Sequence, residues 1–409
     1  MRLKDIANIN PAYTGPDLGD QLVSFAPMEC LRYDSLKPFT ISFSEAKGKY
    51  TFFQDNDILF AKVTPCFENQ NIAIANNLVN GIGFGSSEIN VLRLKSDVSL
   101  RYMFYVICSN QFYNTGCSSM CGVGGLKRIN PRAVSTFEFT MPSLAEQEAI
   151  AAYLDKECEK IGRKIELLER KADAYSRLRR SLINRAVPRG LGPNTPMKST
   201  LIPWLGAIPA HWNIKRGKSL FKEVSRAVRP EDGVVTCFRN GEVTLRTNRR
   251  ITGFTESEQE IGYHGVRIGD LIIHQMDAFA GAIGISDSDG KCSPICIVCR
   301  EINSSEADLK YYCQLLRVMS HRGYIQALAK GIRERTTDFR YKTLASLHFP
   351  VPPIDEQKEI AAYLDEKCAK IDTILEKINT EVERLKELKR SLINEVVTGQ
   401  RAIETESRS

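Results

Sequence analysis

The side chains in this sequence that could do chemistry are suited to reading a nucleic acid rather than to catalysis. Base edges are read by side chains with defined donor and acceptor geometry, and phosphates are bound by charge or by backbone amides. Two basic turns that begin with glycine, residues 122–128 and 331–335, hold such side chains. The simpler interpretation of any single candidate is a solvated surface residue. Further candidates are Lys62, Asn69, Gln70, Arg246, Asn248, Arg249, Arg250, His274 and Gln275.

Patterns for catalysis or metal binding are weak by comparison. Cys296 and Cys299 have a spacing that zinc sites use, but an internal repeat aligns them with Ile89 and Leu92, so we predict buried strand positions. The five histidines show no metal spacing. The chain has no Asn-Pro-Pro-Tyr or Asp-Pro-Pro-Tyr tetrapeptide and no Walker A sequence, which argues against an adenine methyltransferase or a motor protein. We therefore expect no catalytic residue, no metal and no cofactor in this chain.

Composition and charge are typical of a multidomain globular protein. The 409 residues suffice for two or three domains, and no apolar run approaches the roughly 18 residues that span a bilayer. The first residues lack the apolar core of a secretory signal, so we expect a cytoplasmic protein without membrane contact. The net charge is +1 over residues 1–142, +3 over 143–197, +6 over 198–352 and −3 over 353–409. The third block is the most favourable for a polyanionic partner, whereas the near-neutral first block argues against strong unaided binding of DNA.

The organising feature of the sequence is an internal repeat. Residues 146–155 return at 356–365, and residues 180–184 return at 390–394, both at an offset of 210. Apolar residues within both copies alternate at steps of three and four, which is the pattern of a coiled-coil helix. Ser143 and Glu146 have the spacing of a capping box at the start of the first helix. The residues predicted to form the helix–helix seam and to dock partners are Ile150, Tyr153, Leu154, Ile161 and Leu182 in the first copy and Ile360, Tyr363, Leu364, Ile371 and Leu392 in the second.

The blocks that precede the two helices are also related, more weakly. Residues 56–60 resemble 269–273, and residues 100–102 resemble 309–311. Both blocks alternate turn residues with β-rich runs. The predicted fold is α+β, with two mixed α/β domains separated by two long antiparallel coiled-coil helices that form a pseudo-twofold repeat. The predicted boundaries are a first domain at 1–142, a helix at 143–187, a linker at 188–203, a second domain at 204–352, a second helix at 353–398 and a tail at 399–409.

This architecture has a geometric consequence for recognition. Antiparallel pairing of the helices would place the domains at opposite ends, related by a pseudo-twofold axis, and duplex DNA has local twofold symmetry. Unlike domains would then read an asymmetric target in two parts with a gap of unread bases. The pattern alone leaves two alternatives open: a coiled-coil scaffold that joins two protein-binding domains without DNA contact, and an enzyme whose domains are cryptic methyltransferases.

The repeated segments resemble a known family. The pattern Pro-[Ser/Pro]-x-x-Glu-Gln-x-x-Ile-Ala-x-Tyr-Leu-Asp at 142–155 and 352–365 is similar to the conserved regions of type I restriction–modification specificity subunits, as is Arg-Ser-Leu-Ile-Asn at each helix end. The segment 204–212, with tryptophans at both ends, resembles the opening of that family's second target-recognition domain. The first domain departs from the pattern because it has no comparable opening segment.

The resemblance implies a non-catalytic subunit with two target-recognition domains, each reading one half of a bipartite site in double-stranded DNA. It also implies docking of two methyltransferase subunits, which supply S-adenosylmethionine binding and adenine methylation, and it leaves open whether two restriction subunits that use ATP and Mg²⁺ join them. In that family the turn before each helix lies against DNA. The resemblance therefore makes Lys127, Arg128, Arg333 and Arg335 the first candidates, supported by Arg340 and Lys342.

Overall fold

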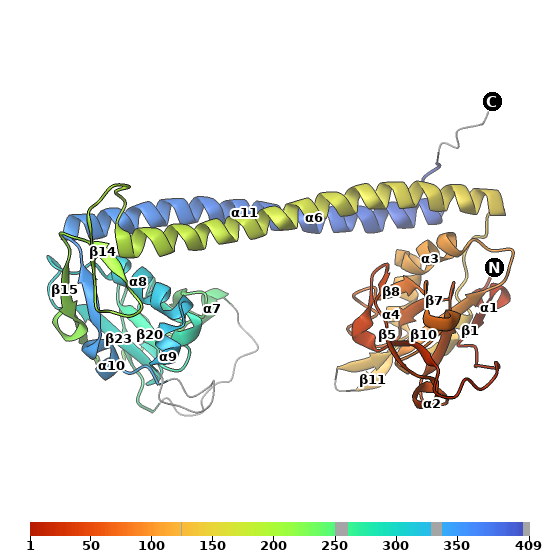
Figure 1. Ribbon diagram of the computed structural model, residues 1–409, viewed down its shortest axis with the longest axis horizontal. Helices are drawn as coiled ribbons and strands as arrows, with labels where there is room; N and C mark the ends of the chain where they lie inside the picture. Colours follow the sequence, from red (N-terminus) through yellow and green to blue (C-terminus); the bar gives the residue numbers. More distant parts are fainter. Residues whose placement is uncertain (124, 250–260, 329–337, 404–409) are drawn as a thin grey trace. The chain divides into compact units, whose positions relative to one another are not determined.

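A computed structural model of the chain describes residues 1–123, 125–249, 261–328 and 338–403. The chain forms two compact units (Figure 1). Unit 1 comprises Met1–Arg170 and Ile378–Ser409, and unit 2 comprises Lys171–Lys377. Each unit therefore contains one globular domain together with part of each long helix.

Unit 1 holds five short helices and twelve strands among its described residues. Its helices are α1 (Leu3–Ile6), α2 (Phe43–Ala46), α3 (Leu100–Cys108), α4 (Asn110–Ser118) and α5 (Pro131–Ser135). Its strands are β1 (Ala7–Ile9), β2 (Leu22–Ala26), β3 (Leu31–Arg32), β4 (Ser35–Leu36), β5 (Phe39–Ser42), β6 (Thr51–Gln54), β7 (Ile58–Ala61), β8 (Ile72–Ile74), β9 (Ile82–Gly85), β10 (Ile89–Leu94), β11 (Cys121–Val123) and β12 (Leu126–Arg128).

Unit 2 repeats this mixed α/β composition in its described part. Its short helices are α7 (Arg246–Arg249), α8 (Leu309–His321), α9 (Tyr324–Ala327) and α10 (Tyr341–Ser346). Its strands are β13 (Met197–Ser199), β14 (Ala207–Pro209), β15 (Asn213–Arg216), β16 (Phe221–Glu223), β17 (Val235–Cys237), β18 (Val243–Leu245), β19 (His264–Val266), β20 (Leu271–His274), β21 (Ile283–Ile285), β22 (Gly290–Cys292), β23 (Cys296–Glu301) and β24 (His348–Val351).

The two long helices are α6 (Leu144–Arg189) and α11 (Ile354–Val397). Lys164 of α6 pairs with Glu381 of α11 within unit 1, and Arg179 pairs with Asp372 within unit 2. Residue numbers rise along one helix as they fall along the other, so the helices are antiparallel, as the sequence predicted. The predicted capping box is present, because the Ser143 N–H and hydroxyl donate to Glu146 and the Glu146 N–H donates to the Ser143 hydroxyl. No helix in the described ranges has the length and apolarity that would span a bilayer.

Each unit is built around a four-stranded sheet of the same topology. The strand order is β1-β10-β7-β8 in unit 1 and β16-β23-β20-β21 in unit 2, with antiparallel neighbours throughout. Ile89 pairs with Ala61 in the first sheet, and Cys296 pairs with His274 at the equivalent place in the second. Cys296 and Cys299 are buried strand residues, as the repeat predicted. The pseudo-repeat thus extends from the helices into the strand pairing of the domains.

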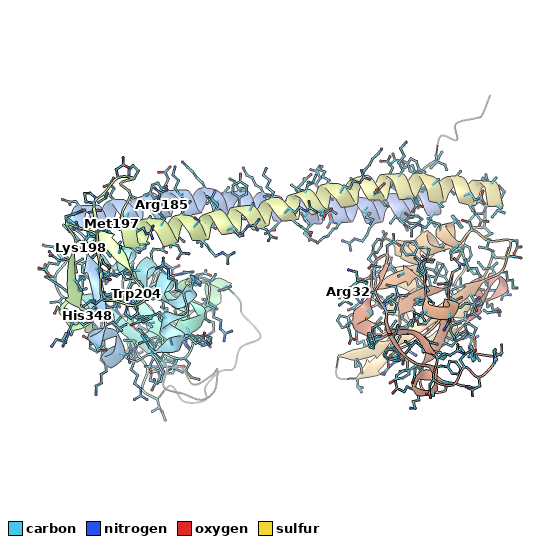
Figure 2. All side chains as sticks on the ribbon, in the orientation of Figure 1. Arg32, Arg185, Met197, Lys198, Trp204 and His348 are labelled. Carbon is cyan, nitrogen blue, oxygen red and sulfur yellow. The ribbon has the colours of Figure 1, made fainter. Side chains whose placement is uncertain are left out.

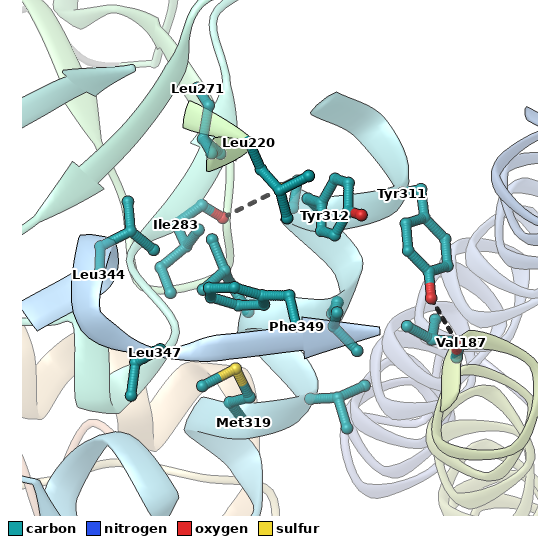
Figure 3. Packing of buried hydrophobic residues seen from close by; sticks show 14 of the residues in the cluster. Val187, Leu220, Leu271, Ile283, Tyr311, Tyr312, Met319, Leu344, Leu347 and Phe349 are labelled. Atoms are coloured by element: carbon teal, nitrogen blue, oxygen red, sulfur yellow. Dashed lines mark hydrogen bonds between the residues drawn. The ribbon is translucent and has the colours of Figure 1, made fainter. Parts of the chain in front are cut away.

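A buried helix joins each sheet to the long helices. In unit 1 the cluster contains Phe60 of β7, Tyr105 of α3 and Leu154 of α6, together with Leu392 of α11. In unit 2 the corresponding helix is α8, and its Tyr311 hydroxyl donates a hydrogen bond to the Val187 carbonyl of α6 (Figure 3). The domains are therefore fastened to the long helices by apolar packing, which is the dominant source of such stability.

The segment predicted to be a Gly/Pro-rich linker, 188–203, contains a strand of its own. This strand, β13, includes Met197 and Lys198, which are labelled in Figure 2, and it pairs with β14. Lys198 donates a hydrogen bond to the Trp212 carbonyl. Gly190 has a positive φ of 74° directly after α6, as expected of a residue that ends a helix. The chain therefore turns back and contributes a strand to the unit 2 fold immediately after the helix. The sequence showed the Gly and Pro residues but not the register of this hairpin.

Candidate nucleic-acid interface

The candidate interface begins with a turn that sets the start of the central strand in each unit. Asn56 and Gly269 have positive φ angles of 68° and 85°, and each is followed by a buried aspartate. Asp57 accepts the Gln54 N–H at 2.8 Å and two bonds from Arg93, the shorter at 2.7 Å. Because the turn and the neighbouring strand β10 are tied to one carboxylate, the start of β7 has a defined position in the sheet.

Unit 2 builds the same turn with a larger set of cations. Asp270 is fully buried and accepts the Arg267 N–H at 2.8 Å. Arg226 donates to it at 2.5 and 3.2 Å, and Arg300 lies 3.5 Å away. Buried charges need such partners because desolvation penalises an unpaired carboxylate. The aspartate of the repeated Asp-hydrophobic strand is thus a structural anchor in both units.

A repeated glutamine fastens the buried helix of each unit to the long helix. Gln147 accepts the Ser99 N–H and donates to the Pro142 carbonyl, both at 2.9 Å. Gln357 accepts the Asp308 N–H at 2.9 Å and donates to the carbonyls of Glu306 and Pro352. Ser99 and Asp308 are the N-cap residues of α3 and α8, so the Gln of the repeated Glu-Gln pair locks the start of each buried helix.

In unit 1 the strand β7 leads directly to the hairpin β11–β12. The Thr64 hydroxyl donates to the Gly125 carbonyl at 2.8 Å and accepts the Lys127 N–H at 3.0 Å. The Thr64 N–H in turn donates to the Lys127 carbonyl at 3.0 Å. All six strand residues of this hairpin are exposed, and Val123 is 90% exposed. The structure therefore brings Lys62 and the predicted Lys127 and Arg128 together at an exposed hairpin.

Arg128 is already held by an acidic partner. Its guanidinium makes bonds of 2.7 to 3.1 Å to the Glu88 carboxylate, and these bonds lower the pKa of Glu88. The Lys62 N–H donates to the Glu88 carbonyl, so the same residue positions both cations. Thr64 and Glu88 were missed by the sequence analysis, since their contacts join segments about 40 to 60 residues apart and no local signal marks them.

The structure separates Asn69 and Gln70 from this hairpin. Gln70 has a positive φ of 52°, and its side chain donates to the Cys108 carbonyl at 3.3 Å. Both amides line a groove of about 520 Å³ next to Lys386, Lys389 and Arg390 of α11. Their predicted part in base reading stays a prediction, and their position groups them with the long helix instead.

In unit 2 His274 and Gln275 occupy the positions of Ala61 and Lys62. The Gln275 N–H donates to the Ile295 carbonyl, and the Phe339 N–H donates to the Gln275 carbonyl, as the Ile129 N–H does to Lys62. Nδ1 of His274 accepts the Asp277 N–H at 3.1 Å. Burial lowers the pKa of His274, although the Asp277 charge opposes this, so the imidazole favours its neutral form.

The remaining unit 2 candidates do not form one cluster. Asn248 donates to the Thr244 hydroxyl at 2.9 Å, and Arg249 lies over the Phe238 ring and pairs with Glu242. Arg246 is half-buried at the start of α7. Arg340 pairs with Asp338 at 2.6 Å just before α10, whereas the Lys342 side chain is exposed. The predicted Arg250, Arg333 and Arg335 lie outside the described residues.

The predicted seam residues are buried or half-buried within their own units. Leu154 and Leu392 belong to the unit 1 cluster, with Ile150, Tyr153 and Ile161 packed against it. Ile360 and Leu364 belong to the unit 2 cluster, with Leu182 and Tyr363 packed against it, and Ile371 is 5% exposed. These side chains stabilise the chain's own fold, and a part in docking partners stays a prediction.

Comparison with known proteins places these two units in a family. Residues 1–171 and 214–384 match the family model described as the type I restriction modification DNA specificity domain. The chain belongs to this family. The resemblance inferred from the repeated motifs is thereby confirmed. Within the described residues, no group of three or more His, Cys, Asp and Glu side chains is placed to hold a metal ion.

Curated relatives are similar over parts of their length. The chain is 36% identical over 160 residues to the specificity subunit of the type I restriction enzyme EcoEI of Escherichia coli and 38% identical over 152 residues to that of EcoAI from the same species. These alignments cover 38% and 36% of this chain but span only about a quarter, 27% and 26%, of the relatives. The StySPI specificity subunit of Salmonella potsdam is 22% identical over 318 residues, which are 76% of this chain and 67% of the relative.

Solved structures share the fold at low sequence identity. One comes from work on the structural basis of complex assembly and conformational transition of the type I R-M system, with a TM-score of 0.73, 15% identity and coverage of 98% of this chain and 97% of that chain. The crystal structure of the HsdS subunit from Thermoanaerobacter tengcongensis has a TM-score of 0.52 at 15% identity, with coverage of 98% and 96%. These likenesses concern the fold: two mixed α/β domains with paired long helices.

Proposed function

We propose that the chain is the sequence-reading subunit of a type I restriction–modification enzyme and that it recognises a bipartite, asymmetric DNA target. The observation that carries the proposal is the pair of units with one common frame and different additional strands. The turn at Asp57 or Asp270 and the glutamine at 147 or 357 are alike in both. In unit 1 the exposed hairpin with Lys127 extends from that frame. Equal frames with unlike additional strands suit two different half-sites on opposite strands.

The proposal assigns no chemical step to this chain. Neither a methyltransferase tetrapeptide nor a Walker A sequence occurs in it. Two methyltransferase subunits would bind S-adenosylmethionine and methylate adenine, and restriction subunits, where present, would use ATP and Mg²⁺. The exposed faces of α6 and α11, which carry ion pairs such as Arg163–Glu159 and Lys370–Glu366, are open to such partners.

The alternative is a coiled-coil scaffold that joins two protein-binding domains without touching DNA. Membership of a DNA specificity family does not favour it. The two functions differ in a simple measurement, because DNA binding through phosphates weakens steeply as salt rises. A full chain that, together with its methyltransferase subunits, shows no salt-dependent affinity for duplex DNA would support the scaffold.

The decisive experiment maps methylated adenines in DNA from cells that express the chain with its methyltransferase subunits. We expect methylation at two half-sites with a constant separation. Exchange of residues 1–142 for those of a homologous chain should change one half-site and leave the other intact. Methylation at a single continuous site, or a change in both half-sites after the exchange, would contradict the proposal.

A further inference from the structure

A basic pair recurs near one end of the repeated helix, where each long helix packs against its domain. Arg179 and Arg180 of α6 precede Ser-Leu-Ile-Asn in unit 2, and Lys389 and Arg390 of α11 precede the same four residues in unit 1. Arg180 and Arg390 are exposed, whereas Arg179 and Lys389 are half-buried. The repeat keeps these cations although the domains that face them have diverged.

In unit 2 the facing helix α8 adds positive charge rather than a counter-charge. Its Arg317 makes no ion pair and no hydrogen bond to any described residue, and its guanidinium lies over Gly241, where a Cβ would come within 1.3 Å of Nη1. Burial lowers the pKa of Arg317, and the nearby Arg179 lowers it further. His321 follows one turn later, and its pKa is lowered by burial and by Arg317, Arg180 and Arg179. The three arginines therefore repel one another in the fold, and their charge favours the neutral form of His321.

The positive charge of Arg179 is only partly neutralised by its acidic partner. Its Nε lies 3.1 Å from the Asp372 carboxylate, yet this atom is buried and makes no hydrogen bond of good geometry. A buried guanidinium nitrogen without a good acceptor weakens this pairing, and the Arg179 side chain, which is 33% exposed, can still be reached by an anion. The unit 2 cluster, defined as Arg179, Arg180, Arg317 and His321, thus has the charge and the unused donors of an anion site.

In unit 1 the equivalent pair lines the groove of about 520 Å³. Nζ of Lys389 lies 4.2 Å from the centroid of the Tyr33 ring, which holds the ammonium without neutralising it. The groove also contains two carboxylates, Glu68 and Glu383, of which Glu383 pairs with Lys386 at 2.8 Å. The other polar lining residues, which include hydrogen-bond donors, are Asn69, Gln70, Asn110 and Tyr113.

The ligand that fits both places is a phosphodiester. It carries one negative charge and accepts hydrogen bonds from guanidinium, ammonium and amide donors, and its chemistry does not depend on base sequence. Half-sites that differ in bases present the same phosphates, which explains why the cations recur while the domains diverge.

We propose that Arg179 and Arg180 with Arg317 and His321 in unit 2, and Lys389 and Arg390 with the groove amides in unit 1, bind backbone phosphates of the DNA. This rests on the proposed function and adds a sequence-independent contact at the junction of helix and domain. The contact would position the duplex, while the exposed loops read bases.

The test measures DNA affinity of the full chain, bound to its methyltransferase subunits, against salt concentration. The duplexes are one with the mapped target and one unrelated sequence of equal length. Each lost phosphate contact should reduce the slope of log affinity against log salt by about 0.9, which corresponds to roughly fivefold weaker binding at 0.15 M salt. The variants Arg179→Gln/Arg180→Gln and Lys389→Gln/Arg390→Gln should each weaken binding to both duplexes by roughly thirtyfold when both contacts are lost.

Matched controls separate a local contact from loss of net charge. Lys47→Gln/Lys310→Gln removes the same charge from exposed positions, one in each unit, that pair with Asp17 and Asp365, and it should change affinity less than about twofold. Arg180→Lys should keep the wild-type slope.

Three outcomes would overturn the inference alone. The first is a salt slope of the double variants equal to that of the control variant, and the second is weaker binding to the target duplex only. The third is a variant chain that fails to hold its methyltransferase subunits while the fraction that does assemble binds DNA normally. Failure of the wild-type complex to bind DNA would overturn the proposed function as well.

Discussion

Units 1 and 2 share the contacts that fix their central backbone segments, but they differ in the strands added around these segments. Both have a sheet of the same strand order, a buried aspartate after a residue of positive φ, and a glutamine that caps the buried helix. Outside this frame they diverge. Unit 1 adds a second four-stranded sheet, β5-β2-β9-β6, whereas unit 2 adds the two-stranded pairs β17-β18 and β19-β22. The frame positions the domain on the helix, and the additions give it its own surface.

The units also differ in charge and in titratable groups. All five histidines and both tryptophans lie in unit 2, within residues 171–377. The aspartate anchor of unit 2 has two guanidinium neighbours, Arg226 and Arg300, where that of unit 1 has only Arg93 among the described residues. The two aspartates therefore occupy equivalent positions but neutralise different numbers of guanidinium groups. Variants at equivalent positions of the two units measure how similar the energetics of the two frames are.

The largest effect is expected at the buried aspartates. Asp270→Asn should lower the free energy of unfolding of unit 2 by about 3 kcal/mol, because Arg226 and Arg300 lose their shared counter-charge. Asp57→Asn should cost unit 1 less, since one partly exposed guanidinium is affected. Hydrogen exchange of β20 and β7 within the same molecule measures both. The exposed Asp287→Asn serves as control. The expectation would be contradicted if each variant reduced the exchange protection of β20 and β7 equally.

A smaller effect is expected at the repeated glutamines. Gln357→Ala removes three hydrogen bonds and should cost about 2 kcal/mol, whereas Gln147→Ala removes two and should cost about 1 kcal/mol. Protection at the first turns of α8 and α3 reports each loss. The exposed neighbours, in the variants Lys358→Ala and Glu148→Ala, should change protection little. A larger loss of protection in Gln147→Ala than in Gln357→Ala would contradict this expectation.

The smallest effect is a pH dependence confined to unit 2. The pKa values of His274 and His321 are lowered in the folded chain, so the unfolded chain takes up protons first as pH falls below about 6.5. Stability is therefore full above that pH and decreases below it as the pH falls toward 5.5. Urea unfolding followed by tryptophan fluorescence reports unit 2.

The double variant His274→Gln/His321→Gln should flatten this pH dependence, and His348→Gln, at an exposed position, should leave it unchanged. The paired carboxylates whose pKa values are lowered, such as Glu88 and Glu146, lose their contribution only at lower pH. A decrease of equal size in the double variant would show that other groups cause it.

Much of the frame could be predicted from the sequence because its signals are local or repeated. The three-and-four spacing of Ile150, Leu154 and Ile161 predicted the long helix, and Ser143 with Glu146 predicted its start. The repeat also placed Cys296 and Cys299 on a buried strand. The spatial grouping of the interface candidates could not be predicted from the sequence. Lys62, Lys127 and Arg128 meet at one hairpin, but Asn69 and Gln70 line a groove against α11.

The sequence by itself determined the family, the repeat and the long helices, because apolar periodicity and a constant offset survive divergence of everything between them. The antiparallel direction of the helices was predicted, and the ion pairs between them show it. Tertiary structure decided which polar side chains are structural and which stay available. Thr64 and Glu88 hold the hairpin through contacts distant in sequence, and β13 pairs inside a segment that looked like a linker. Such contacts depend on which distant segments of the chain fold against each other. The same residue type can form a hydrogen bond to a buried group or face solvent, and the local sequence does not distinguish the two.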